Sequence, residues 1–375
     1  MLYAIGMRTD SRAFVAALPR LALAAGWLLA CGSDPQPQIQ VGGHAGQAAG
    51  GSGGLSGGAS QSGMGGASSG AAGASGGSDV GVAGLGGAGG SAGGGGALLP
   101  FKCPDGVFPM PDVGDSQQVC QGFQFNHPFN EGPTWVGGAF YFSNFVQGAQ
   151  GGDLSGDIVK YTPGGDCEIF IEGAGTNGLA AAKNGNLLGA RHETRSITEF
   201  DIVTKQPTIL SDMFMGSMLD SPNDLVQHSN GGIYFTNPTH ELGGRPQGVG
   251  PAIFRRDPAG MLSTLSEGNP QPNGITLSPA EDRLYVVNGG LWDLDANGVP
   301  SNRRDFPLQA DGLGMDCAGN VYLSGGTIRN PDGVQIGQFS GGTNLAFGGP
   351  DGKTILVVVG GTGVKIMQTN VPGLP

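Results

Sequence analysis

The sequence predicts an all-β fold, a six-bladed β-propeller, preceded by an export signal and a flexible segment. Three observations support this prediction. A short motif recurs six times in the C-terminal part of the chain, a strongly β-prone run follows each copy, and no stretch of that part keeps a helical period. We predict a signal at residues 1–30, a linker at 31–97 and the propeller at 98–375.

The N-terminus has the pattern of an export signal. Three arginines precede a ten-residue apolar run that ends at Ala30, which is too short to span a bilayer. Leu28 to Cys31 also resembles the bacterial lipobox, in which the cysteine becomes lipid-modified and begins the mature protein. The alternative is an ordinary signal peptide cut near Ala30. Both predict export. The first predicts a lipid-anchored bacterial membrane lipoprotein on the periplasmic or cell-surface face.

The segment from Val41 to Ala97 is almost entirely Gly, Ala and Ser. It holds 26 glycines and a single carboxylate, Asp79. Such a segment cannot bury enough apolar surface to offset the conformational entropy lost on ordering. We therefore expect a flexible tether without chemistry of its own.

The charge balance bears on possible partners. The chain has 18 basic and 30 acidic residues, which gives a formal net charge of −12. Nucleic-acid-binding domains usually carry basic patches, so this balance argues against a nucleic-acid partner. The sequence identifies no protein partner.

The recurring motif predicts the blades. Each copy opens with a polar residue and a small or turn-forming residue, and the copies begin at Glu131, Asn177, Asn223, Asn273, Asp311 and Thr343. Successive starts are 46, 46, 50, 38 and 32 residues apart, close to the roughly 40–50 residues of a four-stranded blade. Asn184-Gly185, Asn230-Gly231 and Asp351-Gly352 suit the hairpin turns. Residues 101–126 should supply the strand that closes the ring.

Four cysteines lie in the predicted propeller, and four cysteines allow three pairings. Cys103 and Cys120 are close in sequence and flank a Pro/Gly/Asp-rich segment. We therefore expect these two to form a disulfide. Cys167 and Cys317 would then be buried thiols.

The first strand of each blade lines the channel of a propeller, so the six starting residues should meet at one mouth. Each carries a side-chain oxygen and none is basic. Carboxylates and amides that converge in this way favour a hard divalent cation, calcium above all, with magnesium, manganese or zinc as alternatives. Asn-Gly and Asp-Gly are ordinary turn pairs, so the prediction depends on their recurrence at one structural position.

The second strand of each blade returns to the same mouth, and its end should form a second tier that faces the substrate. These ends are Asn144, His192, Asn237, Asn288, Ser324 and Gly360. His192 can accept a proton from an attacking water or orient a substrate hydroxyl. The alternative is a hydrogen-bonded structural histidine. His240, in the long loop after Asn237, is a further candidate.

Several motifs now carry a family resemblance. They are Glu131-Gly132-Pro133-Thr134-Trp135, Ser221-Pro222-Asn223-Asp224-Leu225, Tyr234-Phe235-Thr236-Asn237-Pro238, Pro272-Asn273-Gly274-Ile275 and Asp311-Gly312. Over residues 120–360 they resemble the SMP-30/gluconolactonase/LRE (regucalcin-like) family. Asn177-Gly178-Leu179 with His192 and Arg195 is similar to its bacterial gluconolactonase branch.

The resemblance implies one catalytic divalent metal, often calcium, held by Glu131, Asn273 and Asp311. Asn223 matches a position that contacts the metal, its water or the substrate. The implied metal set is therefore Glu131, Asn223, Asn273 and Asp311. The implied fold is the six-bladed propeller that the repeats predict.

We expect a metal-dependent lactonase, a hydrolase that opens a sugar lactone or similar cyclic ester. The metal would polarise the carbonyl and lower the pKa of its water, while Asp311 or His192 takes the proton. Asn177, Asn223 and His192 would bind the substrate. No Gly-x-Ser-x-Gly nucleophile elbow occurs in the predicted propeller.

Three alternatives stay open. The same cage can serve phosphotriester hydrolysis, because oxygen ligands do not define the reaction class. A non-catalytic cell-surface module would use the cation structurally and bind a glycan or protein. The third alternative is a degenerate ring that holds no stoichiometric cation.

Overall fold

The structure is a computed structural model that describes residues 102–148, 154–267, 271–361 and 363–375. The predicted signal and linker, with the lipobox cysteine Cys31, lie outside the described residues. Regular structure in the described ranges consists of β-strands joined by turns. Among these residues we find no helix with the length and apolarity of a membrane span.

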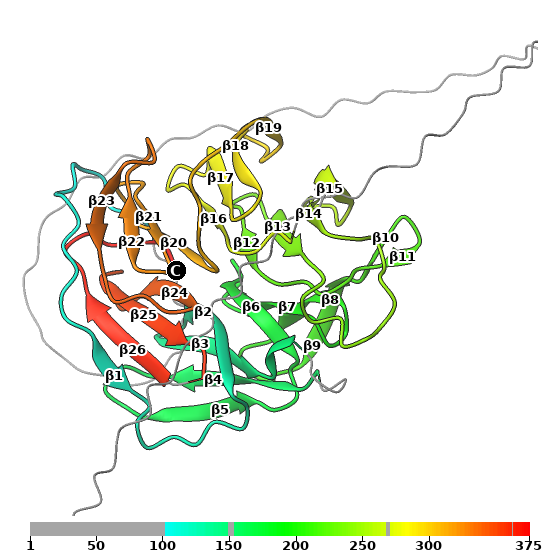
Figure 1. The fold of residues 1–375 in the computed structure, drawn as a ribbon, viewed down its shortest axis with the longest axis horizontal. Helices are drawn as coiled ribbons and strands as arrows, with labels where there is room; N and C mark the ends of the chain where they lie inside the picture. Colours follow the sequence, from blue (N-terminus) through cyan, green and yellow to red (C-terminus); the bar gives the residue numbers. More distant parts are fainter. Residues whose placement is uncertain (1–101, 149–153, 268–270, 362) are drawn as a thin grey trace, which may run out of the picture. The chain divides into compact units, whose positions relative to one another are not determined.

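Six four-stranded antiparallel sheets form the blades, and the first strand of each lies nearest the centre (Figure 1). From the channel outward the strands are β2 (Phe129–Val136), β3 (Ala139–Phe145), β4 (Gly156–Tyr161) and β5 (Cys167–Ile171) in blade 1; β6 (Thr176–Ala181), β7 (Leu187–Arg191), β8 (Ser196–Phe200) and β9 (Pro207–Ser211) in blade 2; β12 (Leu225–Gln227), β13 (Ile233–Asn237), β14 (Ala252–Arg256) and β15 (Leu262–Glu267) in blade 3; β16 (Ile275–Leu277), β17 (Arg283–Val286), β18 (Gly290–Leu294) and β19 (Pro300–Arg304) in blade 4; β20 (Leu313–Met315), β21 (Val321–Leu323), β22 (Thr327–Arg329) and β23 (Gln335–Gln338) in blade 5; and β24 (Asn344–Gly348), β25 (Thr354–Val359), β26 (Gly363–Gln368) and β1 (Gln117–Val119) in blade 6. The six-bladed prediction is confirmed.

Strand β1 closes the ring. It pairs antiparallel with β26, with Gln118 opposite Lys365, so blade 6 combines the two ends of the described chain. The expectation that residues 101–126 supply the closing strand is therefore confirmed. A short hairpin, β10 (Met213–Phe214) with β11 (Ser217–Met218), lies between blades 2 and 3 along the chain.

The predicted hairpin turns have the backbone that their sequences favour. Gly185, Gly231 and Gly352 have φ of 87°, 94° and 70°. In each turn the glycine amide donates to a carbonyl three residues earlier. Side chains with a Cβ rarely adopt this left-handed conformation, which explains why Asn-Gly and Asp-Gly mark the turns.

The hydrophobic core is divided among the gaps between neighbouring blades. Each of six buried clusters draws its side chains from two adjacent blades. In β3, Phe140 and Phe142 pack toward blade 6, whereas Ala139 and Tyr141 pack toward blade 2. Because side chains alternate along a strand, each blade buries both of its faces. These clusters hold each blade against its two neighbours. The inner strands are thereby kept together around the channel.

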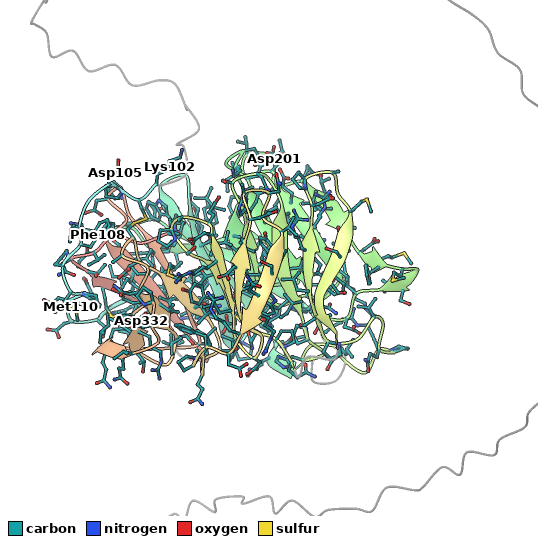
Figure 2. All side chains as sticks on the ribbon, turned by 90° about the horizontal axis from the view of Figure 1, so that it is seen from above. Lys102, Asp105, Phe108, Met110, Asp201 and Asp332 are labelled. Atoms are coloured by element: carbon teal, nitrogen blue, oxygen red, sulfur yellow. A yellow bond between two sulfur atoms is a disulfide. The ribbon has the colours of Figure 1, made fainter. Side chains whose placement is uncertain are left out.

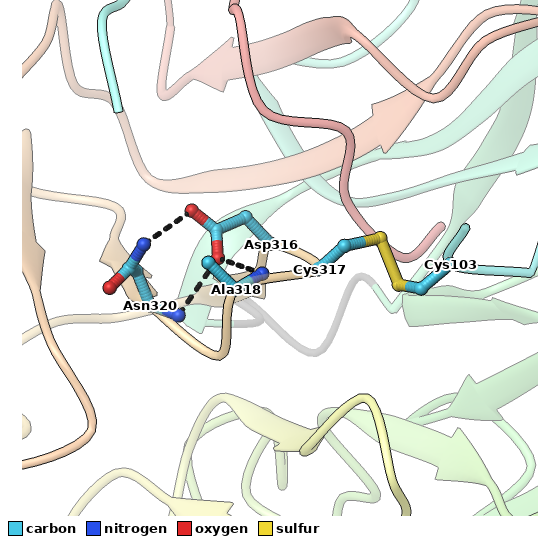
Figure 3. Close-up of a disulfide and its surroundings, with 5 residues drawn as sticks. All are labelled: Cys103, Asp316, Cys317, Ala318 and Asn320. Atoms are coloured by element: carbon cyan, nitrogen blue, oxygen red, sulfur yellow. Dashed lines mark hydrogen bonds between the residues drawn. A yellow bond between two sulfur atoms is a disulfide. The ribbon is translucent and has the colours of Figure 1, made fainter. Parts of the chain in front are cut away.

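The disulfides correct the expected pairing. Cys103 is bonded to Cys317 and Cys120 to Cys167, with Cα atoms 5.3 Å and 5.1 Å apart. Cys120 follows β1 at the outer edge of blade 6, and Cys167 opens β5, the outer strand of blade 1. That bond joins two neighbouring blades, which spacing in the sequence does not reveal. Figure 3 shows Cys317 beside the turn that Asp316 and Asn320 form, with Cys103 of the N-terminal segment across the bond.

Candidate functional site

The six predicted ring residues stand at the channel-side starts of the inner strands. Glu131 and Asn177 lie within β2 and β6, and the other four precede β12, β16, β20 and β24 by one or two residues. Neighbouring blades are joined at this level by four hydrogen bonds: Gly178 N to Asn223 O (2.6 Å), Gly274 N to Asp311 O (2.8 Å), Gly312 N to Thr343 O (3.1 Å) and Thr343 Oγ1 to Asn130 O (3.0 Å). The structure therefore brings the ring positions of the repeat to one end of the channel.

The residue after each ring position explains how the ring packs so closely. In copies 1, 2, 4 and 5 it is glycine. A Cβ on Gly178 would lie 2.6 Å from the carbonyl oxygen of Asn223, and a Cβ on Gly312 would overlap the side chain of Asn344. Any larger residue would push the neighbouring blades apart.

Copies 3 and 6 replace that glycine with Asp224 and Asn344. Both are buried, and both line the cavity that the inner strands of the blades surround. Burial raises the pKa of Asp224 to about 7, although hydrogen bonds from the Leu225 amide and the Asn344 side chain lower it. Neither residue was assigned a role from the sequence. The signal was present, because the second position of the repeat is polar in these two copies only.

Two carboxylates of the ring interact. Burial raises the pKa of Glu131 well above its usual range, and the charge of Asp311 raises it further. Burial also raises the pKa of Asp311, while His240 and a hydrogen bond from Asn273 lower it. Like charges held together in a buried site call for an opposite charge or a proton.

One oxygen of Glu131 has no partner of its own. Oε2 accepts a hydrogen bond from the Gly132 amide at 2.8 Å. Oε1 is buried and has no hydrogen-bond partner of ordinary geometry within the described residues, although the nearby Asn344 side chain lowers the pKa of Glu131. An unpaired buried carboxylate oxygen is costly, and a cation beside it would satisfy it. The donor set Glu131, Asn223, Asn273 and Asp311 thus fits a hard divalent ion.

The proposed donor set needs the amide oxygens of Asn223 and Asn273 as well as its two carboxylates. No group of three or more His, Cys, Asp or Glu residues is arranged to hold a metal in the part of the chain that the structure describes. Calcium accepts carbonyl oxygens from Asn as well as carboxylates, so two acids with two amides suit it better than they suit zinc.

The loop at residues 238–251, between β13 and β14, brings a further carboxylate to this site. Glu241 is 4% exposed, and burial together with the charge of Asp311 raises its pKa to about 7. Its Oε2 has no partner among the described residues. The neighbouring His240 is exposed, and its charge lowers the pKa of Asp311. Glu241 was not predicted, because no periodic signal marks a loop residue.

Hydrogen bonds tie this loop to three blades. Arg245 donates to the carbonyls of His192 (2.7 Å) and Glu193 (2.7 Å) in blade 2 and to those of Glu241 (3.1 Å) and Leu242 (2.8 Å) in its own loop. Further bonds join Thr239 to Gln271 ahead of blade 4, and the Gly248 and Gly250 amides to Asp220 ahead of blade 3. These hydrogen bonds hold the loop in place at this end of the channel. We call residues 238–251 the roof.

His192 lies beneath the surface. It is 0% exposed, its Nε2 is 3.2 Å from the Leu154 carbonyl, and its ring packs on Phe145. Burial lowers its pKa to about 4, so the ring is neutral at pH 7. Nε2–H donates to Leu154, which leaves the lone pair on Nδ1, an atom without a partner among the described residues. These contacts favour the structural alternative, and a role in proton transfer stays a prediction.

Three further residues of the predicted second tier are buried. Asn144 and Asn237 are 0% exposed and Ser324 is 1% exposed. Asn144 binds the backbone of His127, and Ser324 accepts hydrogen bonds from the Asp311 and Gly312 amides. These polar side chains satisfy backbone groups of the segments that lead into the ring. At these three positions the expected substrate-facing side chain instead serves free backbone groups at the strand ends. Asn288 is exposed, and its place in a substrate-facing tier stays a prediction.

Comparison with known proteins agrees with the motifs. The sequence pattern of the SMP-30/gluconolactonase/LRE-like region matches residues 129–360. The gluconolactonase of Zymomonas mobilis is 31% identical over 278 residues, which cover 61% of this chain and 75% of that protein. The pentonolactonase XacC of Haloferax volcanii is 28% identical over 169 residues, which cover 38% of this chain and 56% of that protein.

Solved structures of similar fold agree as well. A gluconolactonase of Xanthomonas campestris superimposes with a TM-score of 0.56 at 22% identity, over 72% of this chain and 99% of its own. The calcium-binding protein regucalcin of Agrobacterium tumefaciens superimposes with a TM-score of 0.53 at 20% identity, over 67% of this chain and 92% of its own. Since the family pattern spans more than half of the sequence, this protein belongs to the SMP-30/gluconolactonase/LRE-like family.

Proposed function

We propose that this protein is an exported, metal-dependent hydrolase that opens a sugar lactone. One observation carries the proposal. Glu131 and Asp311 converge at the end of the channel, the charge of Asp311 raises the pKa of Glu131, and one Glu131 oxygen lacks a partner among the described residues. Similarity to a gluconolactonase and a pentonolactonase supports the lactone as substrate.

Glu131, Asn223, Asn273 and Asp311 would hold the divalent ion, and we propose calcium. When bound, the ion's contribution is to polarise the lactone carbonyl and to lower the pKa of the attacking water. Asp311 accepts the proton of that water, because it is the ring carboxylate that is only partly buried. His192 is the second candidate for this proton.

The amides of Asn177 and Asn223 orient the ring hydroxyls of the substrate. Glu241 adds a hydrogen-bond acceptor from the roof, since its Oε2 is buried without a partner among the described residues. A polyhydroxylated ring supplies the donors that such acceptors need. The proposed location is a bacterial membrane, with the propeller outside the cytoplasm and a lipid anchor at Cys31.

Proton release from a panel of sugar lactones tests the function. The purified full-length chain is assayed with calcium, with other divalent ions and after chelation. Hydrolysis that the chelator abolishes and calcium restores is the expected result. Preferential turnover of organophosphate esters would indicate the phosphotriesterase alternative. Metal binding without hydrolysis would indicate a surface-binding module, and a folded protein without stoichiometric metal would indicate a degenerate ring.

Variants of the ring residues test which of them bind the metal. Asp311→Ala and Glu131→Ala should lose metal and turnover together, because each removes a charged ligand. His192→Ala should keep the metal. Full metal occupancy in Asp311→Ala, measured by calorimetric titration with calcium, would contradict the ligand assignment.

A further inference from the structure

The hairpin of β10 and β11 carries three methionines in six residues. Met213 pairs directly with Met218, and Phe214 pairs with Ser217. Met215 and Gly216 form the turn, with φ of 49° and 84°. The run from Met213 to Met218 therefore reads Met-x-Met-x-x-Met and folds back on itself.

The two faces of this hairpin differ. Phe214 packs on Phe254 with ring centroids 5.2 Å apart, and it joins the hydrophobic cluster between blades 2 and 3. Because directly paired residues share a face of a two-stranded sheet, Met213 and Met218 lie together on the opposite face. They are 49% and 44% exposed, and Met215 is 89% exposed. None of the three is needed to fill the core.

A fourth methionine borders the same surface. Met261, at the turn between β14 and β15, is 71% exposed. It lines one concavity with Met213 and Met215, and the apolar residues of that concavity, Leu210 and Leu262, pack against the core cluster. The exposed apolar side chains of this surface are therefore methionines, whereas its leucines pack toward the core.

Thioether sulfur is a soft, uncharged ligand that stays unprotonated at any pH. Soft thioethers select copper(I), whereas the hard oxygens of the ring select calcium or magnesium. Asp212, exposed beside Met213, and the net charge of −12 add attraction for a cation.

We propose that Met213, Met215, Met218 and Met261 form a thioether site for copper(I), separate from the ring and independent of lactone hydrolysis. Directly opposed residues of an antiparallel pair have Cβ atoms about 4.5–5.5 Å apart, so Met213 and Met218 can place both sulfurs on one ion. The turn residue Met215 and Met261 across the concavity supply the remaining ligands.

Competition with a chromogenic copper(I) chelator under anaerobic conditions tests the site. The full-length chain carries Cys31→Ser, because the other four cysteines are engaged in disulfides. Expected results are one copper(I) per chain and an affinity at least about 30-fold weaker in the variant with Met213, Met215 and Met218 all changed to Leu. Leucine keeps the apolar volume and removes the sulfur. X-ray absorption at the copper edge should show sulfur ligands.

Met110→Leu is the matched control. Met110 is 64% exposed in the segment before β1, and it lies at the opposite edge of the propeller from β10 and β11 (Figures 1 and 2). This variant should bind copper(I) as the parent does. Unchanged affinity in the triple variant, equal loss in Met110→Leu, or oxygen and nitrogen ligands in the absorption spectrum would each overturn the proposal.

A second measurement needs no variant. Silver(I) is a redox-inert probe of thioether sites, and its binding should slow peroxide oxidation of Met213, Met215 and Met218 by at least about tenfold, read by peptide mass spectrometry. Oxidation of Met110 should be unaffected. Equal oxidation rates at the hairpin methionines with and without silver(I) would overturn the site even if the triple variant failed to fold.

Discussion

Gly178 and Asp224 compete for one space in the channel, since a Cβ on Gly178 would lie 2.6 Å from Asp224 Oδ1. The glycine of the second repeat is thus required by the acid of the third. The same relationship holds between Gly312 and Asn344. Two polar side chains can enter the channel below the ring because the glycines of the neighbouring copies leave room.

Gly178→Ala should lower the free energy of unfolding by about 2 kcal/mol or more, because overpacking a rigid site costs about 1–3 kcal/mol and here the near atoms include backbone. Urea unfolding measures the change. The control is Gly325→Ala, since a Cβ on Gly325 meets nothing within 4 Å. Equal free energies of unfolding for the two variants would contradict the close contact between blades 2 and 3 at Gly178.

Metal-free protein should lose stability as pH rises. Burial raises the pKa of Glu241 from 4.5 to about 7, so its contribution is fully present below pH 4.5 and is lost as pH rises through 7. That shift corresponds to about 3 kcal/mol. Urea unfolding in chelator at pH 5 and pH 8 measures the loss, and Glu241→Gln should remove only the part that Glu241 contributes, because burial also raises the pKa of Asp224 and of Glu131.

Glu168→Gln is the matched control for this pH effect. Glu168 is an exposed acid whose pKa is lowered by its hydrogen bond and ion pair with Lys160. Its removal should leave the loss between pH 5 and pH 8 intact. A metal-free protein that is more stable at pH 8 than at pH 5 would contradict the burial of an uncompensated acid.

Arg245 is a positioning residue for the roof. Its fork binds two carbonyls of blade 2 at 2.7 Å, which the compact ammonium of lysine does not reproduce. Arg245→Lys and Arg245→Gln should lower kcat/KM for lactones about tenfold, with calcium affinity unchanged. Amide hydrogen exchange in the loop at residues 238–251 should become faster, with or without substrate.

Arg255→Lys is the comparison for Arg245. Arg255 lies in β14, outside the roof loop, and donates to the Asn297 carbonyl at 2.9 Å. It should leave both kcat/KM and hydrogen exchange in the loop unchanged. Slow exchange retained in Arg245→Gln would show that the other anchors suffice.

The disulfide Cys120–Cys167 should stabilise the closed ring. It links residues 47 apart in sequence, and loop closure in the unfolded chain is then worth about 3–4 kcal/mol. The variant Cys120→Ser/Cys167→Ser should lose about that much in urea unfolding. Peptide mapping of the oxidised protein checks the pairing directly, and a Cys103–Cys120 peptide would contradict it.

The sequence by itself determined the number of blades, the ring positions and the hairpin turns. These features depend on local chemistry: Asn-Gly and Asp-Gly turns, β-prone runs, and a polar residue at the same point of each repeat. A repeat also predicts that its equivalent positions meet, because the channel of a propeller is built from equivalent strands. The repeat alone therefore predicts that Glu131 and Asp311 lie at the same end of the channel.

Only the tertiary structure decided the rest. Cys120 lies beside Cys167 because ring closure joins blade 6 to blade 1. Glu241 reaches Asp311 because Arg245 pins its loop to another blade. His192 is buried because the roof and Phe145 cover it. Each of these depends on contacts between segments far apart in sequence, and such contacts leave no periodic trace along the chain.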